Sequence, residues 1–299
     1  MLKNLSELID IAKQKKTRRL AVAAAADKPV LEAVRDAMKE GIITPILVGE
    51  KEKIEKISAE IGLNLEGVEI IDNQKGAVVS AKIAVALIRE EKADILMKGL
   101  VSTGPLLKAV LDKEKGLRKG ATLSHVAFFE SPYYHKLLCV TDAAMNVAPE
   151  FNDKVHILNN AVEAYHKLGI EMPKVAVIAA VEAVNPKMES TVHAAMLTMM
   201  NKRKQIKGCI VDGPLAVDNA VSKEAADHKG IVSDVAGDAD IFLAPEIQSG
   251  NIFYKSLNFL GGSTSAAVIM GATVPVVLTS RSDTDKSKML SIALAAAME

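Results

Sequence analysis

Residues 95–104 read ILMKGLVSTG, an apolar run that ends in a lysine, two glycines and two hydroxyl side chains. A second run, residues 274–281, reads VPVVLTSR and ends in the same way, with two hydroxyls and an arginine. Short apolar runs are typical of buried parallel strands, and ligands of open α/β sheets bind beyond the carboxyl ends of such strands. Backbone N–H groups, hydroxyls and a cation suit a phosphate or a carboxylate. The two runs therefore predict an α/β fold that binds an anionic small molecule.

The rest of the chain alternates between short apolar runs and longer helical patterns, which is typical of parallel βαβ units. The strands expected are Leu20–Ala25, Pro45–Val48, Val68–Ile71, Ile95–Met97, Val126–Phe129, Leu137–Thr141, Val175–Ala180, Gly208–Val211, Ile241–Leu243 and Val274–Leu278. The helices expected are Pro29–Glu40, Lys51–Ile61, Lys75–Glu91, Leu106–Leu111, Asp153–Leu168, Ser190–Met200, Asn251–Leu260, Ser263–Met270 and Lys286–Met298.

The last expected strand and helix have no partner nearby in the sequence, so we expect them to return to the first half of the chain. This predicts two α/β domains around a cleft. The first is discontinuous, residues 1–147 plus 272–299, and the second is residues 148–271. A length of 299 residues also favours two domains over one.

Composition excludes several classes of protein. Lys plus Arg and Asp plus Glu number 37 each, which argues against a nucleic-acid-binding protein. No apolar stretch reaches the roughly 18 residues of a membrane span. Cys139 and Cys209 lie in apolar runs without the spacing of a zinc site, so no metal is expected. Two thiols of this kind fit a reducing, cytoplasmic environment.

We call the segment that directly follows a strand the exit of that strand. The exit after residue 97 contains Lys98, Ser102 and Thr103, which are candidate ligands of an anionic substrate. Lysine provides a cation, and the two hydroxyls provide hydrogen-bond donors. The alternative is an ordinary strand-to-helix turn in which Ser102 or Thr103 only caps the helix. The residues alone favour neither explanation.

Two further exits carry polar side chains. Asp212 follows the expected strand Gly208–Val211, and we expect it to point into a crevice as a substrate-binding residue. Gly250 and Asn251 follow the expected strand Ile241–Leu243 and form either a backbone pocket for a ligand or simply the start of a helix.

Ser280 and Arg281 form the most specific of these exits. A guanidinium binds phosphate through two parallel hydrogen bonds and stays charged throughout turnover, so we assign both residues to function. Asp283 and Asp285 follow, and Asp285 is expected to cap the final helix.

The chain contains no Walker sequence and no G-x-G-x-x-G after a strand, which argues against an ordinary ATPase. Coenzyme A has no comparably short motif, so this absence does not exclude it.

Taken in order, the exits resemble those of the phosphate acetyl/butyryltransferase family, and the length resembles its butyryl branch. The resemblance covers essentially the whole chain and is carried by residues 30–37, 97–101, 123–127, 185–188, 206–209, 211–216, 239–243, 250–251, 254–255 and 276–281.

The resemblance implies an acyltransferase that moves an acyl group reversibly between coenzyme A and inorganic phosphate: butyryl-CoA and phosphate give butyryl phosphate and CoA. It implies a fold similar to isocitrate and isopropylmalate dehydrogenases, a homodimer, and no permanently bound cofactor, since coenzyme A is a substrate. Acetyl-CoA as the substrate, a dehydrogenase of similar fold and a non-catalytic acyl-CoA-binding module are the alternatives.

By the same resemblance, Ser280 and Arg281 match the family's Ser-Arg at the phosphate and thioester end of the site. The acetyl branch has a catalytic aspartate seven residues after that serine, where this chain has Ser287. We therefore choose Asp283 as the catalytic base. The methionine-rich helix Ser190–Met200 is expected to present an apolar face for a dimer through the second domain.

Overall fold

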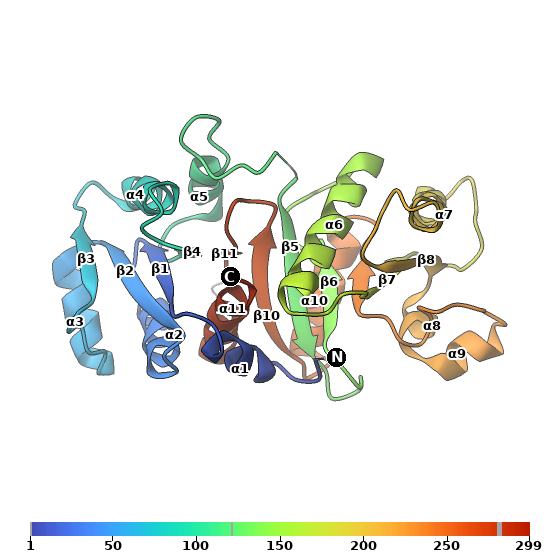
Figure 1. The fold of residues 1–299 in the computed structure, drawn as a ribbon, viewed down its shortest axis with the longest axis horizontal. Helices are drawn as coiled ribbons and strands as arrows, with labels where there is room; N and C mark the ends of the chain where they lie inside the picture. The colour runs from blue at the N-terminus through green and yellow to red at the C-terminus, as the bar shows by residue number, and fades with distance from the viewer. Residues whose placement is uncertain (1, 121, 280–282) are drawn as a thin grey trace. The chain divides into compact units, whose positions relative to one another are not determined.

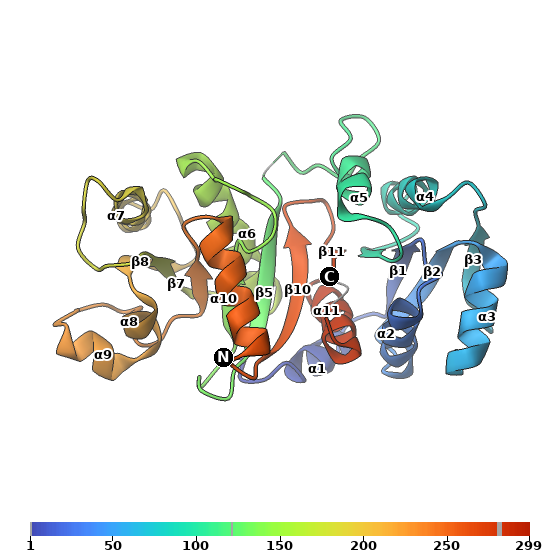
Figure 2. The ribbon, with the colours of Figure 1, turned by 180° about the vertical axis from the view of Figure 1, so that it is seen from behind.

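The computed structural model describes residues 2–120, 122–279 and 283–299. The chain divides into two compact units (Figures 1 and 2). We call Ser6–Ala121 with Ala266–Glu299 the terminal unit, and Met1–Leu5 with Thr122–Ser265 the central unit. Within the described residues, no helix has both the length and the apolar character needed to cross a membrane.

The two units differ from the expected domains in residues 1–5 and 122–147, which belong to the central unit, and in residues 266–271, which belong to the terminal unit. The largest difference is residues 122–147. The reason is strand pairing: Val140 in this segment pairs in parallel with Phe242, deep in the central unit. The domain division at 147/148 and 271/272 stays a prediction, whereas the compact units meet at 121/122 and 265/266.

The strands of the terminal unit form the order β3-β2-β1-β4-β11-β10. Their bounds are β1 (Arg18–Ala23), β2 (Ile43–Gly49), β3 (Glu69–Asp72), β4 (Ile95–Lys98), β10 (Thr264–Met270) and β11 (Val276–Val277). All neighbours from β3 to β11 are parallel, and β10 is antiparallel to β11. The last strand thus pairs in parallel with β4, from the first half of the chain.

Helices cover both faces of this sheet, which is why its central strands are continuous apolar runs. Figures 1 and 2 show α4 and α5 on one face and α2, α3 and α11 on the other. The helices are α1 (Glu7–Lys13), α2 (Lys28–Lys39), α3 (Lys51–Ile61), α4 (Ala77–Arg89), α5 (Thr103–Val110) and α11 (Asp285–Met298).

The prediction of a helix at Ser263–Met270 is wrong. The structure has a strand there, β10, Thr264–Met270. Six of its seven residues are buried, so both of its faces are covered. A strand buried on both faces does not alternate between apolar and polar residues, and its small apolar residues resemble a buried helix segment.

The strands of the central unit form the order β5-β6-β9-β7-β8. They are β5 (Ser124–Glu130), β6 (Leu138–Thr141), β7 (Lys174–Ile178), β8 (Ile210–Leu215) and β9 (Ile241–Leu243). β5 and β6 are antiparallel, and the other neighbours are parallel. The helix α6 lies in front of this sheet in Figure 1 and α10 in front of it in Figure 2, so the two cover opposite faces.

The helices of this unit are α6 (Phe151–Lys167), α7 (Glu189–Lys202), α8 (Val217–Val221), α9 (Lys223–His228) and α10 (Ile247–Phe259). The sequence analysis did not predict α8 and α9. Helices of five and six residues are too short to show a helical period, although Ser222 caps α9 by accepting a hydrogen bond from the Ala225 N–H at 3.2 Å.

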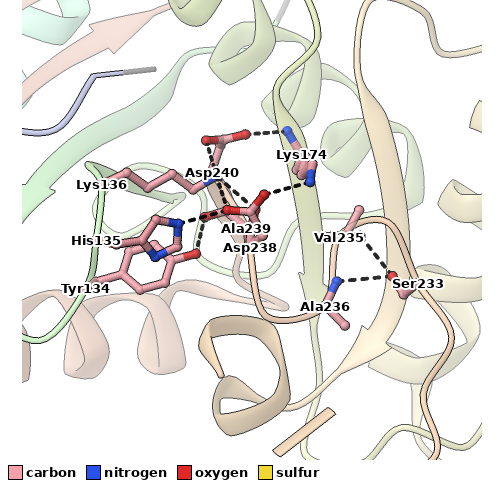
Figure 3. Close-up of polar contacts among 10 residues, drawn as sticks. All are labelled: Tyr134, His135, Lys136, Lys174, Ser233, Val235, Ala236, Asp238, Ala239 and Asp240. Carbon is pink, nitrogen blue, oxygen red and sulfur yellow. Dashed lines mark hydrogen bonds and ion pairs between the residues drawn. The ribbon is translucent and has the colours of Figure 1, made fainter. Parts of the chain in front are cut away.

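At the amino ends of β6, β7 and β9, the central unit has an ion-pair network around the buried Lys136 (Figure 3). Lys136 is 2% exposed, and its Nζ lies 2.9 Å from Asp238 Oδ1 and 2.7 Å from Asp240 Oδ1. Lys174 Nζ and His135 Nε2 also bind Asp238, at 2.6 and 2.9 Å. Since ligands of such sheets bind at the carboxyl ends of strands, this network serves the stability of the fold.

Candidate active site

The candidate site of the terminal unit lies at the carboxyl ends of β1, β4 and β11. Ala23 pairs with Lys98, and Met97 pairs with Val277, so the three strands end side by side. The segments that follow these strands therefore emerge at one edge of the sheet. This is the arrangement that the apolar runs at residues 95–97 and 274–278 predicted.

Gly99 holds two of these segments together. Its N–H donates to the Ala23 carbonyl at 2.8 Å, and the Leu100 N–H donates to the Ala24 carbonyl at 2.7 Å. A Cβ on Gly99 would lie 2.3 Å from the Ala24 oxygen and 2.7 Å from the Ala23 oxygen. Only glycine allows the two backbones to approach this closely.

Replacing Gly99 by alanine is therefore expected to lower the free energy of unfolding by about 2 kcal/mol or more, because neither carbonyl can move without breaking its hydrogen bond. Gly104 is a matched control: it lies in α5, and nothing lies within 4 Å of its added Cβ. Alanine at 104 is expected to be neutral or to stabilise by up to ~1 kcal/mol. Urea unfolding of both variants tests this, and equal midpoints would refute the role given to Gly99.

The polar side chains of the β4 exit lie on the surface of this edge. Lys98 is half-buried, and its Nζ donates to the carbonyls of Gly99 at 3.3 Å and Val101 at 3.4 Å. Ser102 occupies the N-cap position of α5, but its side chain makes no cap hydrogen bond with the described residues. Capping therefore does not explain Ser102, and both it and Thr103 are exposed at this edge.

Ser280 and Arg281 lie outside the described residues. The chain is described again from Asp283, whose backbone carbonyl accepts a hydrogen bond from Nζ of the buried Lys288. The expectation that Asp285 caps the final helix is wrong. Thr284 is the N-cap, and its Oγ1 accepts a hydrogen bond from the Ser287 N–H at 3.1 Å.

In the central unit, Asp212 does not lie at the end of a strand, as expected, but inside β8, where it pairs with Ala176. The strand continues through Gly213 and Pro214, which is possible because β8 is an edge strand that needs no second partner. The Asp212 carboxylate accepts a hydrogen bond from the Gly213 N–H at 2.9 Å and remains partly exposed.

Gly250 and Asn251 lie in the first turns of α10. A Cβ on Gly250 would lie 2.3 Å from the backbone oxygen of Asp142, and Asn251 Nδ2 donates to the Ala143 carbonyl at 2.9 Å. The cap is Glu246, whose carboxylate accepts from the N–H groups two and three residues later. Both predicted residues therefore hold the loop that follows β6.

That loop contains a buried carboxylate, Asp142, which the sequence analysis did not single out. Its Oδ1 accepts from the N–H groups of Ala144 at 2.9 Å, Met145 at 3.1 Å and His125 at 3.3 Å. Its Oδ2 accepts from the N–H and the side-chain amide of Asn146, at 3.0 and 2.5 Å. The signal was present, since an aspartate directly follows the apolar run 137–141. Its hydrogen bonds fix the backbone at the exit of β6.

Two basic side chains near the start of α6 have lowered pKa values. Lys154 is buried, and its Nζ lies 2.9 Å from His193 Nδ1. Burial lowers the pKa of Lys154, although Glu189 and Glu246 act to raise it. Burial and then the charge of Lys154 lower the pKa of His193, while Glu189 acts to raise it.

The structure thus places the predicted residues in two sets. Lys98, Ser102, Thr103 and Asp283 belong to the terminal unit, and Asp212, Gly250 and Asn251 belong to the central unit. Among the described residues, no group of three or more His, Cys, Asp or Glu side chains has the arrangement of a metal site.

Comparison with known proteins identifies the family. The family described as phosphate acetyl/butaryl transferase matches residues 4–82 and 74–296. A phosphate butyryltransferase of Clostridium acetobutylicum is 52% identical over 296 residues, 99% of this chain and 98% of that protein.

Solved structures agree with this assignment. A branched-chain phosphotransacylase from Enterococcus faecalis has a TM-score of 0.84 and 36% identity, over 94% of this chain and 99% of that one. A putative 4-hydroxythreonine-4-phosphate dehydrogenase from Salmonella typhimurium, 12% identical, has a TM-score of 0.61 over 95% of this chain and all of that one, so it is similar in fold alone. The predicted dehydrogenase-like α/β fold is confirmed, and the chain belongs to the phosphate acetyl/butaryl transferase family.

Proposed function

We propose that this protein is an acyltransferase that catalyses reversible acyl transfer between coenzyme A and inorganic phosphate, with butyryl-CoA as the preferred thioester. The observation that carries the proposal is the 52% identity to a phosphate butyryltransferase over 99% of this chain. The terminal unit supports the proposal, because β1, β4 and β11 end side by side at one edge of its sheet. This edge carries Lys98 and the hydroxyl of Ser102, which makes no cap hydrogen bond, and it suits an anionic substrate.

The proposed reaction is direct transfer in a ternary complex. A phosphate oxygen attacks the thioester carbonyl, the C–S bond breaks, and CoA leaves as the thiolate. In reverse, the thiolate attacks the acyl phosphate and inorganic phosphate leaves. Arg281 and Ser280 would bind the phosphate and the developing oxyanion, and Lys98, Ser102 and Thr103 of the adjacent exit would orient the anionic substrate.

Asp283 is the proposed base that accepts the proton of the CoA thiol, which is needed only in the CoA-acylating direction. Its place at the exit of β11, one residue before the cap of α11, supports this choice. For Asp212, Gly250 and Asn251 we keep the proposal of substrate binding. For Gly250 and Asn251 the contribution would come through the loop that they hold at the exit of β6.

Further properties are proposed with this activity. Coenzyme A acts as a substrate, and no cofactor is permanently bound. The protein acts in the cytoplasm, and it forms a homodimer through the central unit. Met196 and Met199 support the dimer, because they leave 44% and 51% of their surface exposed on α7.

A thiol-release assay with phosphate and a series of acyl-CoA esters from acetyl to octanoyl tests the function. We expect kcat/KM for butyryl-CoA to exceed that for acetyl-CoA by about tenfold, since each buried methylene contributes about 0.8 kcal/mol. A higher value for acetyl-CoA would favour the acetyl alternative, which the family also contains. No phosphate-dependent thiol release from any ester would refute acyl transfer altogether.

A further inference from the structure

The last helix, α11, carries a buried lysine that the proposed reaction does not yet use. Lys288 is 4% exposed and lies in the first turn of this helix. The other buried residues of α11 are apolar or carry only a hydroxyl group. Lysine is almost never fully buried unless it is paired, so this position calls for an explanation.

The charge of Lys288 has little compensation. Its Nζ donates a hydrogen bond to the backbone carbonyl of Asp283. Within the part of the chain that the structure describes, it makes no ion pair, not even with Asp285, three residues earlier on the same helix. An ammonium has three donors, and this bond uses one of them. A charge taken out of water without a counter-ion costs free energy.

The position of Lys288 along the helix adds to this cost. The amino end of a helix carries a partial positive charge, which disfavours a cation in the first turn. Lys286 carries the same charge in the same turn, but it is exposed, so water screens it. The stability of the fold therefore does not explain Lys288, whereas an anion bound nearby would.

The charge of Lys288 lies at the exit of β11. Its acceptor, Asp283, follows Ser280 and Arg281, which we propose as phosphate ligands, by three and two positions in the sequence. β11 is the parallel neighbour of β4, so the exit that contains Lys98 begins at the same edge of the sheet. The terminal unit thus has two lysines at the edge proposed for the anionic substrate.

Hydrogen bonds fix the turn that holds Lys288. The Oγ1 of Thr284 accepts from the Ser287 N–H at 3.1 Å, and the Oγ of Ser291 donates to the Ser287 carbonyl at 2.8 Å. The same Oγ of Ser291 accepts from the N–H of Ala267, in β10, at 3.0 Å. The start of α11 is therefore attached to the sheet, and Lys288 attaches the Asp283 backbone to that fixed turn.

We propose that Lys288 is a positioning residue for the phosphate end of the site: its ammonium holds the backbone of Asp283, and its charge favours an anionic phosphate at the exit of β11. The inference rests on the proposed acyl transfer and adds a residue to it. Because Lys288 is buried, it acts through Asp283 and through its charge, which the interior screens less than water does. A charge that lowers stability is retained where function requires it.

Lys288→Met tests this assignment, because methionine has a similar length and no charge. Without phosphate, the variant is expected to unfold at the same urea concentration as wild type or at a higher one, since replacing a poorly compensated buried charge by an apolar side chain is neutral or stabilising. KM for phosphate should rise about tenfold or more, the effect of losing one charge-assisted interaction. KM for butyryl-CoA should stay within about twofold of wild type.

Lys286→Met is the matched control, because it removes the same charge from the same turn at an exposed position. It should equal wild type in stability and in both KM values. A lower urea midpoint of Lys288→Met together with an unchanged KM for phosphate would show that Lys288 only stabilises the fold, and it would overturn the assignment. Equal increases of KM for both substrates would overturn it as well.

Lys288→Gln is the second variant, because its amide is still a hydrogen-bond donor but carries no charge. It should raise KM for phosphate as Lys288→Met does. A wild-type KM for phosphate in Lys288→Gln would refute the role given to the charge.

Thermal unfolding with added inorganic phosphate separates this inference from the reaction. Phosphate should raise the midpoint of wild type and of Lys286→Met, and raise that of Lys288→Met less, because a ligand stabilises the fold according to its affinity. Equal shifts in all three, or no shift in any, would refute the inference. Absence of phosphate-dependent thiol release by wild type would instead refute the proposed function, while the thermal shifts would still decide whether Lys288 favours phosphate.

Discussion

Replacing Arg281 by alanine is expected to lower kcat for phosphate-dependent thiol release at least about 100-fold, without loss of the folded state. Loss of one charge-assisted contact to a developing oxyanion has an effect of this order. Thiol release at saturating butyryl-CoA and phosphate measures it, and circular dichroism checks the fold. Near wild-type turnover with normal phosphate affinity would show that Arg281 does not act in the reaction.

The pH dependence distinguishes Arg281 from the proposed base. A guanidinium does not titrate between pH 6 and 10, so Arg281→Ala should be impaired equally at every pH in that range. Asp283→Asn should lose the CoA-acylating direction at neutral pH and recover it above the thiol pKa of about 8.5, where the nucleophile is already ionised. An Asp283→Asn profile parallel to wild type would place the base elsewhere.

Arg281→Lys serves as the matched variant for charge. Lysine keeps the cation but not the planar pair of donors, so activity is expected between wild type and Arg281→Ala. If the lysine variant is as active as wild type, the site needs only a positive charge at position 281.

Replacing Lys136 by methionine is expected to lower the free energy of unfolding by about 3–5 kcal/mol. Removing one partner of a buried ion pair is strongly destabilising, and the buried Lys136 binds both Asp238 and Asp240 (Figure 3). Asp238 keeps Lys174 and His135 as partners, so the loss is expected to come mainly from Asp240. Lys223→Met is the control, because Lys223 pairs with Asp227 while both side chains are more than half exposed. That variant should change stability by less than about 1 kcal/mol. Urea unfolding measures both variants, and a Lys136→Met value no larger than the control would contradict the role of the network.

The same network predicts how stability depends on pH. Burial acts to raise the pKa of Asp238, but the hydrogen bonds from Lys174, Lys136 and His135 outweigh it and hold that pKa well below its ordinary value. A carboxyl of this kind stabilises the fold above its unfolded pKa of about 3.9, and the stabilisation is lost as the pH falls further. Wild-type stability should therefore begin to drop as the pH falls below about 4 and continue to drop until the folded Asp238 is itself protonated, and the drop should be smaller in Lys136→Met.

The sequence by itself determined the class of fold, and it singled out the strand ends that we propose as the site. The βαβ alternation is a local pattern, because each amphipathic helix and buried strand carries its own periodicity within about ten residues. The strand ends at Lys98 and Thr279 could be predicted for the same reason, since hydroxyls and a cation directly follow an apolar run. The return of the last strand and helix to the first half of the chain was inferred because they had no partner nearby in the sequence; in the structure the last strand pairs with β4.

Other features depend on contacts between residues far apart in the chain, which no local pattern records. β10 is a strand because neighbouring layers bury both of its faces, whereas its composition alone resembles a helix. Asp212 lies inside β8 because pairing with β7 resumes at Leu215 after an irregularity at Gly213 and Pro214, although that sequence is typical of a turn.

The roles of Gly99 and Gly250 follow from the approach of distant backbones, at Ala24 and Asp142. Packing and long-range backbone contacts decided these features, because they depend on distances in space that the order of residues along the chain does not specify.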